Sequence, residues 1–459
     1  MDSVSLYNAL ARIVSQEHVL TGSAIADDYT HDEALTLKPA RPDVLVKPES
    51  AQQIAEIVRL ANSERVPVTA RGSGTGLSGA CVAKRGGILL SFERMRRILE
   101  IDTINQVAVV QPGVTLAQLE EASLAHGLMY PILPGEISGS LGGNVATNAG
   151  GMQAIKYGVT RSNVLGLELV LASGEIVRTG GKLLKISTGF DLTQLVIGSE
   201  GTLAITTEVT VRLRPRCVHR TTLLLPFKTL DQVMGAIPPI VVSGVDPIVL
   251  EYIDALTMIA ITQYAGIELG VPQAIRETAL AYLVVVLEGR NPERVAADVE
   301  ETGARAMELG ALDAFVLSPQ SGTDILRARE QAFWTAKKAG ANDIVDVVVP
   351  RAAMPEYLRR VGAIGQENGT FIAGCGHAGD GNVHLSIFQT DAAIRGKVMK
   401  AIFAAGLELG GAISAEHGIG CEKMSYFLEL ESPQKLALMR QIKAAFDPNG
   451  ILNPGTMLG

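Results

Sequence analysis

Three side chains toward the end of the chain could together bind a divalent metal ion. His377 and His384 flank a glycine-containing turn, GDGN at residues 379–382, that precedes an expected strand near His384. Such a turn could bring both imidazoles to one side, and Glu416 is the obvious carboxylate to complete the set. Two histidines, one carboxylate and an open position form a familiar site for catalytic zinc or a related divalent ion. We therefore predict a metal site at these three residues.

The same segment offers a competing ligand and a general base. Asp380 could also bind the metal, but its place between two glycines suits a carboxylate that stabilises the turn by accepting backbone N–H bonds. A bound cation lowers the pKa of a coordinated hydroxyl. His417 directly follows Glu416, and neutral imidazole has a suitable pKa to take the released proton. The residues therefore favour chemistry on a substrate hydroxyl.

An anionic substrate would need a cationic partner, and arginine is the best suited side chain. Its guanidinium stays charged and can fork to both oxygens of a carboxylate. Arg327 and Arg329 lie on one expected short helix, and either could serve. The alternative for each is an ion pair at the surface.

A glycine loop near the start of the chain predicts an anion site. RGSGTGLSG, residues 71–79, contains a formal G-x-G-x-x-G, but the loop joins an expected strand to another strand and opens no helix, as a Rossmann fingerprint would. Such dense glycines expose backbone N–H groups that can surround a pyrophosphate. The alternative is a mobile turn without a ligand.

Two further tracts could approach a flat, polar ring. Residues 139–151 are rich in glycine and carry Asn144 and Asn148, and we expect a loop over residues 135–151. Downstream, Gly201 lies beside an expected strand that could line an adenine or isoalloxazine site.

Hydrophobic patterning predicts the elements that position these motifs. In the first half we expect helices over residues 1–14, 51–62 and 116–126, and strands over residues 42–46, 67–70, 88–91, 107–110, 164–171 and 203–213. In the second half we expect helices over residues 231–235, 292–309, 354–367 and 392–406, and strands over residues 282–288, 346–349 and 384–388, which is an α+β plan.

Composition excludes several classes of protein. A chain of 459 residues exceeds a single hydrophobic core, so we expect two or three domains around one cleft. A net charge of −8 without a long basic run argues against nucleic acid as a partner. The apolar runs are far shorter than the roughly 20 residues of a transmembrane segment. Four scattered cysteines favour reduced thiols, and hence the cytoplasm.

The motifs, taken in order, resemble those of the vanillyl-alcohol oxidase superfamily. They are RGSGTGLSGA, SLGGNVATNAGG, KYG at residues 156–158, GFDLTQLVIGSEGTL, CGHAGDGNVH, AEHGIG with Lys423, and DPNGILNPG. Within that superfamily the chain is most similar to FAD-linked D-2-hydroxyacid dehydrogenases: the glycolate oxidase flavin subunit and the D-lactate and D-2-hydroxyglutarate dehydrogenases. The likeness runs from about Pro42 to Gly455.

The resemblance implies an α+β fold with three parts. These are an FAD-binding domain of two α/β subdomains over residues 1–215, a cap domain with an antiparallel sheet over residues 216–418, and a C-terminal segment, residues 419–459, that returns to the FAD domain. Pro215 and Cys217 mark the expected junction.

The resemblance also implies roles for individual residues. His417 would be the catalytic base, Arg329 would bind the substrate carboxylate, and His377, His384 and Glu416 would hold Zn²⁺, with Mn²⁺ and Fe²⁺ as alternatives. FAD would be bound non-covalently, because residues 71–80 contain neither histidine nor cysteine. The expected FAD contacts are Arg71, Gly72, Ser73, Gly74, Thr75, Gly76, Ser78, Gly79, Pro134, Gly135, Ser138, Gly142, Asn144, Thr147, Asn148, Gly150, Gly151, Tyr157, Gly158, Glu200, Gly201, Ile205 and Asn453.

The implied reaction is oxidation of a small D-2-hydroxy acid to the 2-oxo acid, with hydride transfer to flavin N5. The 2-hydroxyglutarate enzymes hold the distal carboxylate with residues that align with Phe333, Ile344 and Ser386, none of which is charged. D-Lactate, glycolate or another acid with an apolar side group is therefore favoured, and D-2-hydroxyglutarate is the alternative. An aldonolactone oxidase or a flavin reductase would lack the HAGDGNVH and EHGIG pair.

The chain has no iron–sulfur cysteine pattern, so electrons must leave through another molecule. The expected acceptor is a quinone, a cytochrome, an electron-transfer flavoprotein or a partner subunit. A further alternative is an FAD-carrying subunit of a glycolate oxidase-type electron-transfer complex. The expected location is the cytoplasm, or the periphery of a membrane through a partner, and a homodimer is a possible assembly.

Overall fold

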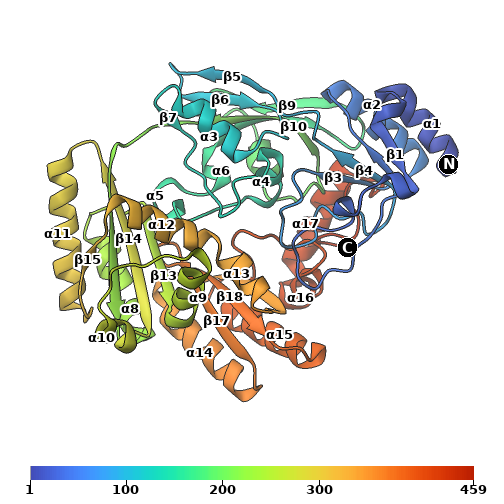
Figure 1. Cartoon of the computed structure of the whole chain (residues 1–459). Helices are drawn as coiled ribbons and strands as arrows, with labels where there is room; N and C mark the ends of the chain where they lie inside the picture. The colour runs from blue at the N-terminus through green and yellow to red at the C-terminus, as the bar shows by residue number, and fades with distance from the viewer. Residues whose placement is uncertain (1) are drawn as a thin grey trace.

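The sheets of the computed structural model, which describes residues 2–459, form two groups that face each other (Figure 1). The first group contains a four-stranded, a five-stranded and a two-stranded sheet, and the second is one seven-stranded sheet. The chain crosses from the first group to the second between Pro215, the end of β11, and His219, the start of β12. This crossing lies near the predicted junction, and the division into domains stays a prediction.

The four-stranded sheet holds the first glycine loop. Its order is β1-β2-β4-β3, in which β2, β4 and β3 are parallel and β1 is antiparallel to β2. All of β2 and β4 is buried, as expected of parallel strands that are covered on both faces. The strands are β1 Val19–Thr21, β2 Val44–Val46, β3 Val68–Arg71 and β4 Ile88–Ser91.

The five-stranded sheet is antiparallel, in the order β5-β6-β10-β8-β9. Its strands are β5 Ile98–Asp102, β6 Val107–Val110, β8 Val164–Val170, β9 Ile176–Gly180 and β10 Ile205–Arg212, and the two-stranded sheet pairs β7 Leu128–Met129 with β11 Arg214–Pro215. Helices of this half are α1 Ser3–Val14, α2 Ala51–Glu64, α3 Leu116–Leu124, α4 Leu141–Thr147, α5 Ala154–Tyr157, α6 Thr160–Asn163 and α7 Leu192–Val196.

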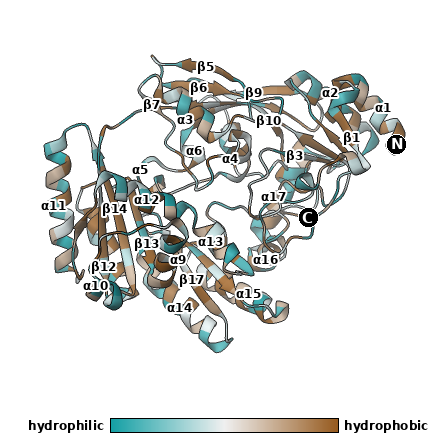
Figure 2. Ribbon diagram, in the orientation of Figure 1, coloured by the Kyte–Doolittle hydropathy of each residue, from teal (hydrophilic) through white to brown (hydrophobic). Residues whose placement is uncertain are grey.

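The seven-stranded sheet is antiparallel and has helices on both faces (Figure 2). Alternate residues of β14 enter two different cores, because Leu283 and Val285 face one side while Tyr282 and Val284 face the other. The order is β15-β12-β14-β13-β17-β18-β16, with bounds β12 His219–Phe227, β13 Val249–Asp254, β14 Ala281–Gly289, β15 Phe315–Val316, β16 Asp343–Val348, β17 Phe371–His377 and β18 Asn382–Phe388.

The helices that cover this sheet have distinct roles. Those on one face complete the larger core: α8 Leu230–Val242, α11 Pro292–Glu308, α14 Met354–Glu367 and α15 Ala392–Glu408. On the other face, α9 Ala255–Ala265 and α12 Pro319–Glu330 contribute to a smaller core, and α10 Gln273–Thr278 and α13 Ala332–Lys338 lie in the same half. No helix of the described residues is long and apolar enough to span a bilayer.

The end of the chain returns to the first sheet. After α16 Met424–Leu430 and α17 Pro433–Phe446, Leu452 bridges to Val68 of β3 and is fully buried in the core beneath that sheet. The buried carboxylate of Asp447 accepts hydrogen bonds from the backbone N–H groups of Ile451 and Leu452 and so holds this turn.

Two expectations about local structure are wrong. The tract expected as a loop over residues 135–151 contains α4, which begins after Ser140, whose hydroxyl accepts from the Gly143 N–H. A Cβ at Gly142 would lie 2.7 Å from Pro112 Cβ, so close packing explains this glycine better than a flexible backbone does. Helix α8 extends beyond residue 235 to Val242, through Pro238 and Pro239. The opening helix was expected from residue 1, which lies outside the described residues.

The C-terminal return should contribute strongly to stability. Leu452→Ala removes a fully buried side chain and should lower the free energy of unfolding by about 2–5 kcal/mol. Leu438→Ala, on the exposed side of α17, should change it by less than about 0.5 kcal/mol. Urea unfolding followed by circular dichroism measures both. Equal effects of the two substitutions would contradict the docked position of this segment.

Candidate active site

A cavity of about 720 Å³ lies between the two groups of sheets. One wall consists of the glycine loop after β3, the tract around α4, and residues 199–206. The other wall consists of α9, α12, α13 and one face of strands β16, β17 and β18. The cavity therefore brings together motifs that are up to 345 residues apart, from Gly72 to His417.

Most of the predicted FAD contacts line this cavity. They come from all three tracts of the first wall: Gly72, Ser73, Gly74, Thr75, Gly76, Ser78, Pro134, Gly135, Gly142, Asn144, Thr147, Glu200, Gly201 and Ile205. The predicted metal ligands His377, His384 and Glu416, the predicted base His417, and Arg329 line the same cavity. Arg327, the other arginine of α12, does not line it.

The remaining predicted FAD contacts do not line the cavity: Arg71, Gly79, Ser138, Asn148, Gly150, Gly151, Tyr157, Gly158 and Asn453. Several of them support it. Arg71 donates to the backbone carbonyls of Asp28 and His31, and Asn453 donates to the carbonyls of Ala80 and Glu200. Their direct contact with a cofactor stays a prediction.

The glycine loop after β3 is closely packed, which argues against the alternative of a mobile turn. A Cβ at Gly72 would lie 2.0 Å from Ser140 Oγ, and one at Gly74, where φ is +77°, would lie 2.1 Å from the guanidinium of Arg71. The loop can adopt this shape only with glycine at both positions. The absence of a helix between β3 and β4 agrees with the sequence-based exclusion of a Rossmann site.

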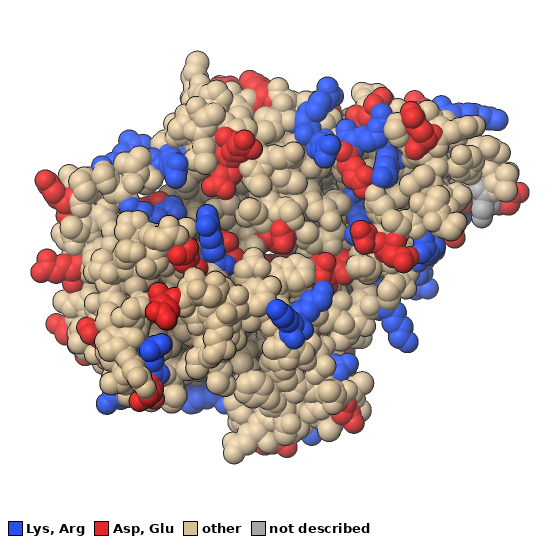
Figure 3. Space-filling model, viewed as in Figure 1, with Lys and Arg blue, Asp and Glu red and all other residues tan. Residues whose placement is uncertain are grey.

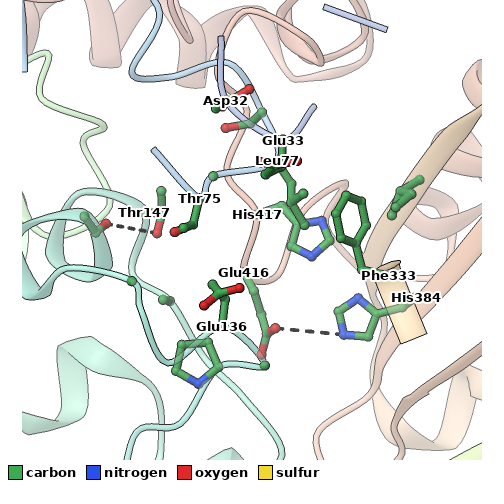
Figure 4. Close-up of a pocket in the computed structure, with 18 of the residues that line it drawn as sticks. Asp32, Glu33, Thr75, Leu77, Glu136, Thr147, Phe333, His384, Glu416 and His417 are labelled. Atoms are coloured by element: carbon green, nitrogen blue, oxygen red, sulfur yellow. Dashed lines mark hydrogen bonds and ion pairs between the residues drawn. The ribbon is translucent and has the colours of Figure 1, made fainter. Parts of the chain in front are cut away.

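The three predicted metal ligands converge in the cavity. His377 ends β17 and His384 lies in β18, so a short hairpin places their rings 4.9 Å apart. Glu416 reaches both: Oε1 lies 3.6 Å from His377 Nε2, and Oε2 lies 3.9 Å from His384 Nε2 (Figure 4). A Cβ at Gly150 would lie 2.3 Å from Glu416 Oε1, so this glycine leaves room for the carboxylate.

A second group of possible ligands, Asp346, His384 and His417, overlaps the first. Both carboxylate oxygens of Asp346 already accept hydrogen bonds from the protein. Its Oδ2 accepts from the Ser414 hydroxyl and from the backbone N–H groups of residues 415–417, at 2.8–3.1 Å, and its Oδ1 accepts from Asn382 Nδ2 at 2.9 Å. With so many donors, Asp346 serves as the anchor of the loop that carries Glu416 and His417 rather than as a ligand. Asp380 does not line the cavity.

A further buried carboxylate joins the metal group to Arg329. Glu251 of β13 is fully buried, and its Oε1 lies 2.5 Å from His377 Nδ1 while its Oε2 lies 2.9 Å from Arg329 Nε. Nη2 of Arg329 is buried and has no hydrogen-bond partner among the described residues. Glu251 therefore holds Arg329 in place and leaves part of its guanidinium available for another anion.

The histidines differ in their electrostatic environment. Burial opposes the charged form of His377, but the carboxylates of Glu251 and Glu416 raise its pKa well above the usual value. Burial, together with the charge of His377, lowers the pKa of His384 well below the usual value. Burial also lowers the pKa of His417, and the charge of Lys423 adds to this against the opposing effect of Asp346. His384 and His417 are therefore neutral near pH 7, as a ligand and a base require, whereas His377 is protonated in the absence of a cation and would release that proton on binding one.

The first half of the chain also holds the loop that carries Glu416. Glu200 is buried, and its carboxylate accepts from the backbone N–H groups of Ile419 and Gly420. A Cβ at Gly418 would lie 2.6 Å from Glu200 Oε1, and one at Gly420 would lie 1.9 Å from the carbonyl oxygen of Ser78. The glycines of EHGIG therefore allow this loop to dock against the glycine loop.

Two protein-family models match the chain. The FAD binding domain matches residues 42–180, and the C-terminal domain of FAD linked oxidases matches residues 217–457. The chain belongs to the family of FAD-linked oxidoreductases. This result confirms the family that the sequence motifs predicted and the expectation of FAD as its cofactor.

Curated relatives span nearly the whole of this FAD-linked oxidoreductase. An uncharacterised FAD-linked oxidoreductase of Mycobacterium tuberculosis is 54% identical and covers 98% of each chain. A D-lactate dehydrogenase of Archaeoglobus fulgidus is 37% identical, covering 94% of this chain and 96% of the relative. A glycolate oxidase subunit of Bacillus subtilis is also 37% identical, covering 94% of this chain and 91% of the relative.

Solved structures confirm the predicted fold. A p-cresol methylhydroxylase matches 99% of this oxidoreductase and 96% of its own chain, with a TM-score of 0.82 and 18% identity. An alkyldihydroxyacetonephosphate synthase matches 99% of this chain and 85% of its own, with a TM-score of 0.76 and 17% identity. The oxidoreductase is thus an α+β protein of the vanillyl-alcohol oxidase type, a likeness that concerns the fold alone.

Sequence reasoning missed Asp346 and Glu251 as parts of the site, and it named Lys423 only as part of a motif. Each is an ionisable residue at a buried position, and Asp346 and Glu251 lie within the apolar strand sequences IVDVVV and VLEYID. A charge inside such a run signals a buried partner, because an isolated buried charge is very costly. Nothing in the sequence identifies that partner.

Asp346 should be essential for the stability of the site loop. Asp346→Asn places an amide where the carboxylate faces several N–H donors, and should lower the free energy of unfolding by about 3 kcal/mol. Asp231→Asn, at an exposed position of α8, should change it by less than about 0.5 kcal/mol. Thermal unfolding of the FAD-loaded protein compares the two, and equal stability would contradict the anchoring role.

Proposed function

We propose that this oxidoreductase converts a small D-2-hydroxy acid, such as D-lactate or glycolate, to the 2-oxo acid, with FAD and a divalent cation. The observation that supports it best is that His377, His384, Glu416, His417 and Arg329 line the same cavity as the glycine tracts of the FAD-binding domain. A cation, a base and a guanidinium are what a 2-hydroxy acid needs for its hydroxyl and its carboxylate. The relatives named above support the same class of reaction.

The first wall of the cavity fits a flavin dinucleotide. Its glycine-rich segments can present backbone N–H groups to a pyrophosphate. The buried polar atoms Ser78 Oγ and Asn144 Nδ2 have no hydrogen-bond partner among the described residues. When bound, FAD supplies the acceptor for the two electrons of the alcohol. We propose non-covalent binding. Cys81 lines the cavity, but burial raises the pKa of its thiol to about 12, so it is a poor nucleophile.

The triad of His377, His384 and Glu416 fits a divalent cation such as Zn²⁺, with Mn²⁺ and Fe²⁺ as alternatives. Glu251 accepts from His377 Nδ1 and so leaves Nε2 facing Glu416, which is the arrangement that orients a metal-binding imidazole. A bound cation would make the substrate hydroxyl more acidic. The residues offer nitrogen and oxygen donors only, as zinc and related ions accept.

The remaining residues would bind the substrate and move its proton. Arg329 has free donors in the cavity wall and would hold the substrate carboxylate, which fixes C2 relative to the flavin side. His417, neutral because of burial and Lys423, would take the hydroxyl proton as C2 is oxidised. The surrounding protein excludes water from these groups, since all of them are largely buried.

The electrons must then pass to an acceptor, for which a quinone, a cytochrome, an electron-transfer flavoprotein or a partner subunit are candidates. A partner subunit is favoured by the relative named as a glycolate oxidase subunit. Acidic and basic side chains are interspersed on the face seen in Figure 3, so this face offers no single charged area for an acceptor. We propose a cytoplasmic protein that reaches membrane acceptors through such a partner.

The proposed function predicts that D-2-hydroxy acids bleach the flavin. Anaerobic addition of D-lactate or glycolate should remove the visible absorbance of bound FAD, while L-lactate should not. Treatment with EDTA should abolish bleaching, and added Zn²⁺ or Mn²⁺ should restore it, because the cation acidifies the hydroxyl. Stopped-flow absorbance measures the rates.

A pair of histidine variants separates the metal site from general effects on the protein. His384→Ala should retain FAD, lose the bound metal measured by elemental analysis, and reduce its flavin at least 100-fold more slowly. His126→Ala, at an exposed position, should match the unchanged protein. A yellow, metal-containing protein that no hydroxy acid reduces would overturn a stand-alone dehydrogenase and favour a subunit that needs its partner.

A further inference from the structure

We infer that the preferred substrate carries an extended apolar tail, which lies in a channel that leads from the histidines along β17 and β18. This inference rests on the proposed function and specifies its substrate class. The channel is part of the cavity described above, on the side formed by the seven-stranded sheet. It extends away from the triad and from Arg329, so it would accommodate the carbons beyond C2.

The floor of the channel is one face of a β-ladder. Along β18, alternate residues His384, Ser386 and Phe388 line the cavity, and they pair across to Cys375, Ala373 and Phe371 of β17. From His384 to Phe388 the strand advances by about 13 Å. The chemistry changes along this path from imidazoles at one end, through small side chains, to two phenyl rings whose centroids are 5.2 Å apart.

The opposite wall is also apolar. Helix α9 contributes Leu256 and Ala260, and helix α13 contributes Trp334 and Ala336. The ring of Phe333 lies beside His384 and His417 in Figure 4, at the start of the channel. Small residues in the middle, Ala373 and Ala260, leave space that larger side chains would fill. The two walls therefore bound a slot that suits an alkyl or arylalkyl group.

The charges of the cavity disfavour a second carboxylate on the substrate. Among the described residues that line the cavity, Arg329 is the one arginine, and no lysine lines it. Glu251 and the substrate's own carboxylate would already engage that guanidinium. Phe333, Ile344 and Ser386 offer no charge to a distal carboxylate, and the other ionisable groups of the cavity wall include the carboxyl groups of Glu330 and Glu136. A second carboxylate would therefore weaken binding of the substrate in the channel, whereas an apolar tail would strengthen it.

The far end of the channel is open rather than closed. Phe371 is 51% exposed, so the ladder meets solvent beyond the two phenyl rings. A tail long enough to reach these rings is held by the walls, while a longer one would extend into water. The walls therefore favour a tail that reaches these rings and set no upper limit to its length.

A series of substrates of increasing length tests this inference. The rate constant of anaerobic flavin reduction, divided by the dissociation constant, is measured for unbranched D-2-hydroxy acids from D-lactate to D-2-hydroxyoctanoate, and for D-2-hydroxyglutarate. Each added methylene should raise this ratio by about three- to fourfold, the factor for burying one CH₂ group. D-2-Hydroxyoctanoate should thus exceed D-lactate by more than 100-fold, and D-2-hydroxyglutarate should be slower than the unbranched five-carbon acid.

A channel variant and a matched control locate the effect. Ala373→Leu fills the middle of the channel. It should reduce the preference for D-2-hydroxyoctanoate at least tenfold, where the preference is the ratio of the rate constant over the dissociation constant for D-2-hydroxyoctanoate to the same quantity for D-lactate. Ala296→Leu, on the exposed side of α11, makes the same change elsewhere and should leave that ratio unchanged.

The outcomes distinguish this inference from the proposed function. Reduction by D-lactate with no dependence on substrate length, or an Ala373→Leu variant with an unaltered ratio, would overturn the channel and leave the hydroxy acid oxidation standing. A faster reaction with D-2-hydroxyglutarate than with D-2-hydroxyoctanoate would also overturn it. Failure of every acid to reduce the flavin would overturn both.

Discussion

The position of one loop, residues 414–420, determines whether the site exists. Two buried carboxylates hold it: Asp346 in the seven-stranded sheet, and Glu200 in the first half of the chain. A buried carboxylate is tolerated only when donors surround it, and here the backbone N–H groups of the loop are those donors. The loop cannot move without leaving two buried carboxyl groups without their hydrogen-bond donors. Glu416 and His417 are therefore fixed relative to both walls of the cavity.

This arrangement explains how residues so distant in sequence come to line one cavity. The hairpin of β17 and β18 supplies two histidines, the anchored loop supplies a carboxylate and a third histidine, and Glu251 connects His377 to Arg329. The same loop packs against the glycine loop that follows β3, where Gly420 lies against the backbone of Ser78. A cofactor in the first wall and a cation in the second would thus share one buried space. The apolar remainder of that space is the channel proposed for the tail of the substrate.

Much of the fold and of the site was accessible from the sequence, for physical reasons that differ from element to element. Buried strands such as β4 and β14 are uninterrupted apolar runs, and the motif residues on the hairpin and in the anchored loop are the ones that converge. The glycine-rich tract around α4 misled the prediction, because its glycines serve close helix packing. Asp346 and Glu251 were missed because their partners lie about 70 and 126 residues away, respectively. Only the folded protein shows such pairs.

The central claim is that the cation site is formed by His377, His384 and Glu416 and faces the flavin. Anomalous X-ray scattering at the metal edge, from crystals of the FAD-loaded protein grown with Zn²⁺ or Mn²⁺, locates the ion directly. We predict one peak within about 2.0–2.3 Å of an atom of each of these side chains. A peak bound instead by Asp346 and His417, or no peak in the cavity at saturating metal, would contradict this account.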